Sequence, residues 1–203
     1  MEIGELKMET PVCLFCLRSG VLCPKCKEKI TSGEVSQLDI NIMRLLLEEE
    51  KDFPILQSYS FIKAIEINSL IVIVFNEGSL SNTSLRIISK LGKSLESKIG
   101  KKVRFIENIA DERKFIEKIV FPARVITINK IWLPDGSVES RLILDNLKNL
   151  KIPKEAIITI AEKVKGITLR IDFEEKGEPI IAKLKHEKQK KISENASLIK
   201  SQV

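Results

Sequence analysis

The feature that most constrains the fold is an order of elements that occurs twice along the chain. Its first copy begins with two runs rich in β-branched and aromatic residues, 61–67 and 70–75. They flank Asn68-Ser69, a pair typical of a tight hairpin turn. A helical pattern follows, ends at Gly100, and leads into a strand pattern over 102–106. The first copy is therefore predicted to be a hairpin, a helix and a strand.

The second copy of this order lies between residues 124 and 173. Two strand patterns, 124–132 and 137–144, surround Pro134-Asp135-Gly136, which is a strong turn signal. Pro153 suits the first position of a helix that ends at Gly166, and 167–173 reads as a final strand. An internal repeat of one small unit predicts an α+β fold.

One further amphipathic helix precedes each copy. Ser36 can cap the first, which Pro54 stops, and the second occupies 111–119 and is broken after Phe121. Each has apolar residues at helical spacing, so each is expected to cover part of the core.

The most basic stretch of the chain is the helical pattern of the first copy and the strand after it. Between Arg86 and Arg104 one acid, Glu96, stands among seven cations. A buried face is predicted from apolar residues three or four apart: Leu85, Ile88, Leu91, Leu95 and Ile99. Arg86, Lys90 and Lys93 share another stripe, which suits a nucleic-acid backbone or an acidic protein surface. A merely solvated face is the alternative.

All four cysteines lie within one short segment near the N-terminus. Cys13 and Cys16 form one Cys-x-x-Cys motif, and Cys23 and Cys26 form a second one. Four thiolates satisfy tetrahedral zinc and leave no open position for catalysis. The sequence therefore predicts a structural Zn²⁺ site in a compact zinc knuckle, with redox thiols or an iron site as alternatives.

Composition narrows the function further. His186 is the only histidine, which excludes a histidine-based triad or metal cluster, and no glycine-rich phosphate loop is present. We therefore expect no enzymatic activity and no small-molecule substrate. The net charge of +6 comes largely from residues 183–203, which hold six Lys and two Glu. Without a long apolar run or a signal-peptide core, the protein is expected to be cytoplasmic and without a membrane partner.

Together these patterns resemble tandem K-homology (KH) domains of NusA, in archaeal NusA-like proteins with a cysteine-rich N-terminus. The resemblance covers roughly residues 11–175 and is most specific at FIEKIVFPARVITI and DNLKNLK. It implies two type II β-β-α-α-β units after a small zinc knuckle and helix. The expected domains are a zinc knuckle (1–35), a linking helix (36–58), a first KH-like domain (59–109), a second KH-like domain (110–175) and a basic, disordered tail (176–203).

The resemblance does not extend to the Gly-x-x-Gly loop with which that family clamps nucleic acid. The matching positions, 86–89 and 152–155, contain no glycine. Ile87 and Ile88 favour one continuous helix, whereas Pro153 removes an amide donor and Glu155 would repel a phosphate. Both loops are therefore degenerate.

Two functions remain from the sequence. The first is an RNA-binding transcription elongation or termination factor, or a ribosome-associated one, that uses basic surfaces. Its candidate nucleic-acid-binding residues are Arg86, Lys90, Lys93, Lys101, Lys102, Arg104, Lys151 and Lys154. The second is a protein adaptor that docks on RNA polymerase or a ribosomal particle without reading RNA. Trp132, beside a turn, is either an exposed stacking or docking residue or the closure of a hairpin core.

Overall fold

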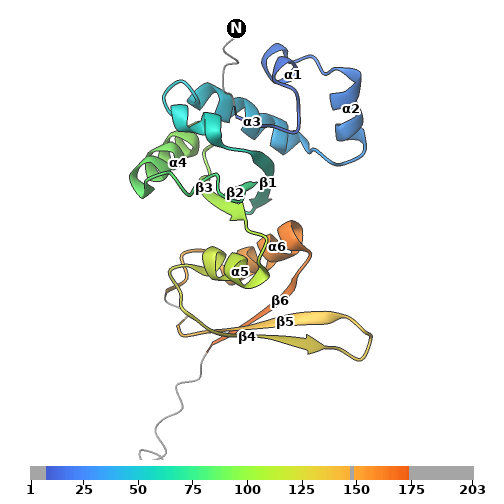
Figure 1. Ribbon diagram of the computed structural model, residues 1–203, viewed down its shortest axis with the longest axis vertical. Helices are drawn as coiled ribbons and strands as arrows, with labels where there is room; N and C mark the ends of the chain where they lie inside the picture. Colours follow the sequence, from blue (N-terminus) through green and yellow to red (C-terminus); the bar gives the residue numbers. More distant parts are fainter. Residues whose placement is uncertain (1–7, 147–148, 174–203) are drawn as a thin grey trace, which may run out of the picture.

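The computed structural model describes residues 8–146 and 149–173 of the 203-residue chain and consists of alternating helical and sheet layers (Figure 1). The helices are α1 (Leu14–Ser19), α2 (Pro24–Thr31), α3 (Gln37–Glu49), the 3-10 helix η1 (Pro54–Ser58), α4 (Leu85–Ile99), α5 (Glu112–Val120) and α6 (Lys154–Lys165). The strands are β1 (Phe61–Ile67), β2 (Leu70–Asn76), β3 (Lys102–Asn108), β4 (Val125–Trp132), β5 (Val138–Leu144) and β6 (Thr168–Phe173).

Two three-stranded sheets repeat the same topology. Sheet 1 has the order β1-β2-β3 and sheet 2 the order β4-β5-β6, with an antiparallel pair followed by a parallel pair in each. The parallel pair requires a crossover, which α4 supplies in the first unit and α6 in the second. The mixed α+β fold and the order hairpin, helix, strand are confirmed.

Sheet 1 is buried on both faces, which explains why β2 reads as the unbroken apolar run LIVIVF. Ile71, Ile73 and Phe75 point into a core shared with α3, α4 and the N-terminal helices. Val72 and Val74 point into a second core with α5, α6 and sheet 2. The two predicted KH-like units therefore share one hydrophobic core, because α5 and α6 lie between the sheets (Figure 1).

Helix α3 is tied to sheet 1 by a buried carboxylate. Ser36 caps the helix, as predicted, and the structure adds a capping box with Asp39. The Asp39 Oδ2 atom accepts from the Ser36 amide at 2.7 Å, and Oδ1 accepts from the Ala64 amide of β1 at 2.5 Å. Asp39 is 5% exposed, so one local cap also fixes the helix on the sheet.

One α-helix, rather than two, lies between the second and third strands of the first unit. Residues 77–83 form turns and bends, and α4 then runs unbroken across the position of the Gly-x-x-Gly loop. The prediction of one continuous helix there is confirmed. In the second unit Pro153 is the N-cap of α6 rather than its first residue. The predicted tail, 176–203, and residues 147–148 of DNLKNLK lie outside the described residues.

The predicted buried face of α4 is correct except at its first residue. Leu91 and Leu95 are buried, and Ile88 and Ile99 are half-buried. Leu85 is 84% exposed, so its predicted burial is wrong. Leu85 is the first residue of α4, and the residues of this helix that join the first core are Leu91, Leu95 and Ile99, in its later turns.

In the described part of the chain, no helix combines the length and the apolar character that crossing a bilayer requires.

Candidate metal centre and nucleic-acid interface

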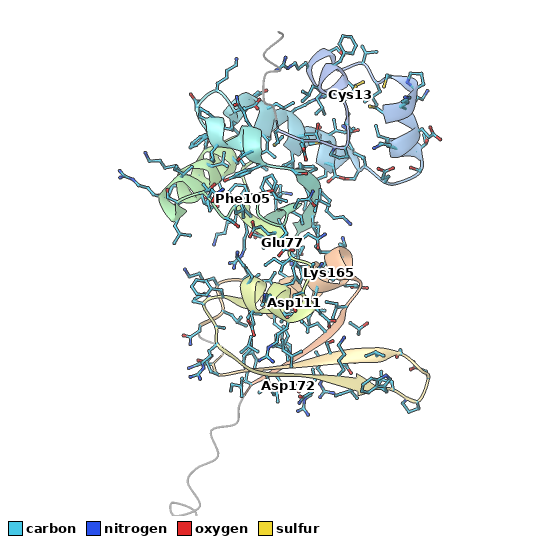
Figure 2. The ribbon with its side chains drawn as sticks, viewed as in Figure 1. Cys13, Glu77, Phe105, Asp111, Lys165 and Asp172 are labelled. Carbon is cyan, nitrogen blue, oxygen red and sulfur yellow. The ribbon has the colours of Figure 1, made fainter. Side chains whose placement is uncertain are left out.

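The four cysteine sulfur atoms come together at one point, between α1 and α2. All four lie within 4.8 Å of one another. The Sγ atoms of Cys13 and Cys16 are 3.1 Å apart, and those of Cys13 and Cys26 are 3.7 Å apart. In a tetrahedral site with Zn–S bonds of about 2.3 Å the sulfurs would be about 3.8 Å apart. The four residues therefore fit a single tetrahedral ion with four thiolate ligands; Figure 2 labels Cys13 of this group.

The two motifs hold their sulfurs in the same way. Cys13 is the N-cap of α1 and Cys23 the N-cap of α2, so Cys16 and Cys26 both lie in the first turn of a helix. The Cys23 amide donates to Cys16 Sγ at 3.1 Å, and the Cys13 amide donates to Cys26 Sγ at 3.4 Å. These reciprocal N–H···S contacts favour the thiolate form that binds a metal.

The same contacts divide the thiols into two pairs of different acidity. The Cys26 amide lowers the pKa of Cys23 to about 7, and the Cys16 side chain lowers the pKa of Cys13. The Cys23 amide lowers the pKa of Cys16, but the Cys13 thiol and burial outweigh it and raise that pKa to about 12. For Cys26 the Cys13 amide opposes burial, yet the pKa is raised. A thiolate repels a second negative charge and so disfavours deprotonation of the neighbouring thiol. A bound cation relieves this repulsion between thiolates.

The cysteine site is joined to the first core rather than standing apart from it. Cys16 and Cys26 are buried in the same cluster as Ile40 and Met43 of α3. The Arg44 side chain donates from Nε to the Leu17 carbonyl at 3.1 Å, at the end of α1. A metal at this site would therefore hold the N-terminal helices on α3.

The candidate nucleic-acid-binding residues on α4 form one outward stripe. Arg86, Lys90 and Lys93 are exposed, and at 100° per residue they lie on the side of the helix opposite Leu91 and Leu95. Among the described residues none of the three has an ion pair or a side-chain hydrogen bond. Their charges are therefore available to a ligand.

Acidic side chains near α4 are occupied elsewhere. Glu96 accepts the Val103 amide at 3.0 Å, which fixes the start of β3. Lys98 pairs with the buried Glu49 at 2.7 Å and with Glu48 at 3.4 Å. These contacts neutralise the C-terminal half of the helix and leave the Arg86, Lys90 and Lys93 stripe without an acid.

The loop before α4 is fixed in place by side chains from several elements. The Tyr59 hydroxyl donates to the Thr83 hydroxyl oxygen at 2.6 Å. The buried Glu107 accepts the Leu80 amide at 2.8 Å and pairs with Lys118 at 2.9 Å. Hydrogen bonds and an ion pair thus hold the loop that leads into the N-terminal end of the basic helix.

The other basic candidates of the first unit are not brought into this stripe as a group. Lys101 pairs with Glu66, whereas Lys102 is exposed and has no partner among the described residues. Arg104 is only half-exposed and donates to the Ile119 and Phe121 carbonyls at 3.4 and 3.2 Å. Burial lowers the pKa of its guanidinium. Arg104 therefore binds the end of α5 through one of its terminal nitrogens, Nη2.

The remaining candidates, Lys151 and Lys154, lie in the second unit. Lys151 is exposed, and Lys154 is the half-buried first residue of α6. Lys154 lies close enough to Asp172 of β6 for its charge to lower the pKa of that carboxyl group. These two lysines therefore belong to a different surface from α4.

Two features of the surface were missed or left open by the sequence patterns. Arg141 and Arg170 come together across two strands that are remote in sequence, and no local signal marks this pair. Trp132 is 73% exposed near the tip of the β4–β5 hairpin, opposite Val138, so it does not close a core.

Comparison with known proteins yields a likeness of fold. No family model and no curated protein sequence matches the chain. Among solved structures, the chain is similar to the one titled "Crystal structure of APE1850", with a TM-score of 0.50 and 12% sequence identity. The alignment covers 69% of this chain and 100% of that chain. At this identity the likeness concerns the arrangement of helices and strands alone.

Proposed function

We propose that this protein is a non-enzymatic RNA-binding factor that contacts RNA through the outward face of α4. The observation that carries the proposal is the stripe of Arg86, Lys90 and Lys93, which is exposed, free of acidic partners among the described residues, and held on a fixed helix. Cations in such a row match the spaced phosphates of a nucleic-acid strand.

The mode of binding follows from the groups available. Lysine and arginine heads contact phosphates, and phosphate contacts carry little sequence information. Ser89 lies within the stripe and adds an exposed hydroxyl donor. We therefore expect affinity with weak base selectivity and a strong dependence on salt.

A NusA-like role in transcription elongation or termination, or on ribosomal particles, is the cellular setting that we propose. What supports it is the repeated unit, in which an antiparallel hairpin and a parallel third strand follow a helix, α3 or α5. This order is compatible with a type II KH domain, and in the first unit turns at residues 77–83 stand in place of the first crossover helix. Since the Gly-x-x-Gly loop is absent, RNA would use the side chains of α4 rather than backbone amides.

We further propose that the four cysteines bind one structural Zn²⁺. Four thiols with reciprocal amide donors suit zinc, and a closed set of ligands leaves no position for a substrate. When bound, the ion would link α1 and α2 into one body, and their buried face would hold that body on α3.

The RNA proposal is tested by fluorescence anisotropy with a labelled single-stranded RNA across a salt series. In one full-length variant Arg86, Lys90 and Lys93 are changed to Glu. In the matched control Lys27, Lys114 and Lys163, which are exposed on other helices, are changed to Glu, so the net charge is the same. In the first variant three cations no longer neutralise phosphates. The negative slope of log K against log salt should therefore become less steep by about 2.

The matched control separates a local site from general charge. It should keep the slope of the wild-type protein if α4 is the site. An equal loss of binding in both variants would refute the assignment to α4. Unfolding curves for both proteins verify that neither change disturbs the fold.

A protein adaptor is the second candidate function, and one observation favours it. Leu85 and Ile87 are 84% and 37% exposed beside Arg86, so the start of α4 combines apolar and basic groups. Such a surface suits a protein partner with apolar and acidic side chains. This candidate predicts that the α4 variant loses RNA polymerase or ribosomal proteins in a pull-down of nuclease-treated extract, while RNA binding is unchanged.

A further inference from the structure

The outer face of sheet 2 carries a second group of cations, distant from α4. Helices α5 and α6 cover the other face of this sheet, and no other helix or strand among residues 8–146 and 149–173 covers the outer face (Figure 1). The parallel register of β5 and β6 places Arg141 directly beside Arg170, and Ile143 beside Asp172. Two arginines on neighbouring strands are thus held side by side.

A single carboxylate holds this arginine pair in place. Asp172 Oδ2 lies 2.6 Å from Arg141 Nε and 3.5 Å from Arg170 Nε (Figure 2 labels Asp172). The hydrogen bond from Arg141 lowers the pKa of Asp172, and the charges of Arg170 and Lys154 add to this effect. Among the described residues three cations therefore act on this one acid, which leaves an excess of positive charge.

The contact to Asp172 uses only one edge of each arginine. Both ion pairs are made through Nε, and among the described residues the terminal Nη atoms of the two side chains donate no hydrogen bond. The side chains of Arg141 and Arg170 remain 44% and 59% exposed. Asp172 thus orients two guanidinium groups whose remaining donors face solvent, and such groups match the geometry of a phosphate.

The two arginines lie at a hollow in the surface that also has an apolar wall. Ile126 and Ile143 line it together with Arg141, Arg170 and Lys154, and Phe173, which packs against the second core, borders it. Ile126, a large apolar residue, is 40% exposed on this face. Cations beside apolar surface suit a nucleotide unit, because the phosphate meets the arginines while the sugar and base cover the apolar wall.

We propose that the outer face of sheet 2 is a second RNA site, at which Arg141 and Arg170 hold one phosphodiester of a single strand and Ile126 and Ile143 contact its nucleoside. The choice of RNA rests on the proposed function, whereas the site itself does not depend on α4. A strand that reaches both surfaces binds more tightly than either site alone, since the second contact becomes intramolecular.

One spectrum of the full-length protein reads both sites. Arginine Nε–Hε resonances of ¹⁵N-labelled protein are assigned by substitution and followed while a short single-stranded oligouridylate is added. The resonances of Arg141 and Arg170 should shift and saturate together. Arg113 of α5, which pairs with Glu117 at 3.0 Å, is the internal control and should not move.

Two variants give opposite effects, which loss of stability alone would not produce. The double change R141Q and R170Q should lower the salt slope for RNA by about 1.4, and R113Q should leave it unchanged. Asp172→Asn removes the competing carboxylate, so it should tighten binding by about two- to fivefold. A carboxylate with a purely structural role would give lower stability and no gain in affinity.

The outcomes distinguish this inference from the α4 proposal. Shifts at Arg86 with none at Arg141 and Arg170 would overturn the second site and leave the α4 proposal standing. Shifts at Arg141 and Arg170 with none at Arg86 would do the reverse. An oligoglutamate peptide that shifts the pair as strongly as the oligouridylate would overturn the assignment to RNA, because the site would then bind acidic peptides.

Discussion

Arg104 and Lys102 lie two positions apart on β3, and we expect their removal to have opposite consequences. The Arg104 guanidinium donates to two carbonyls at the end of α5, at 3.4 and 3.2 Å. A charged hydrogen bond contributes about 1.5–3 kcal/mol, and a cation at a helix C-terminus about 0.3–1 kcal/mol. Both contacts are long and the side chain is half-exposed, so we expect Arg104→Gln to cost about 2 kcal/mol in total.

This cost can be measured directly. For a chain of this length 1 kcal/mol corresponds to about 2–4 °C, so the Tm of Arg104→Gln should fall by about 4–8 °C. Its RNA salt slope should stay at the wild-type value. Lys102→Gln should leave Tm within about 2 °C and, if RNA passes over this edge, lower the slope by about 0.7. An unchanged Tm with a lower slope for Arg104→Gln would refute the structural role assigned to Arg104.

Three other measurements test different parts of the structure. Removing metal with a chelator should lower the free energy of unfolding and release four titratable thiols, and a metal-to-chain ratio near zero in untreated protein would contradict the zinc proposal. Asp39→Ala should cost about 3–5 kcal/mol by urea unfolding, because it removes a helix cap and leaves the buried Ala64 amide unpaired; a loss below about 1 kcal/mol would contradict that account. The pKa values of Asp135 and Asp172 are lowered by hydrogen bonds from Ser137 and Arg141 respectively. Their contribution to stability is therefore complete above the ordinary aspartate pKa of 3.8 and is lost as the pH falls below it. The double variant with Asn at both positions should therefore lose less stability than the wild-type protein as the pH falls below 3.8. An equal loss of stability in both proteins would contradict the prediction.

The candidate metal site could be predicted from the sequence because its determinants are local. Two Cys-x-x-Cys turns bring each pair of sulfurs together within one helical turn, and the connecting segment is short enough to join the pairs. The outward stripe of α4 is local in the same way, since Arg86, Lys90 and Lys93 follow the period of one helix.

The spacing of the basic candidates that follow α4 could not show which of them are exposed to solvent and which bind other parts of the protein. Strand alternation turns Val103 and Phe105 of β3 toward the first core, while Arg104 reaches the end of α5. Whether such a cation meets solvent or a carbonyl depends on which helix covers the second face of sheet 1. That covering is a property of the packed layers and leaves no signature in KKVRF.

The sequence by itself determined the elements, their repeated order, the cysteine cluster and the basic face of α4, because hydrophobic period, turn residues and caps act within a few positions. Only the tertiary structure decided that the two units share a core, that Leu85 lies exposed, that Arg104 binds the end of α5, and that Arg141 lies beside Arg170. These outcomes depend on contacts between elements that are remote in the chain. The register of β5 against β6 and the burial of sheet 1 on both faces arise only when the layers pack.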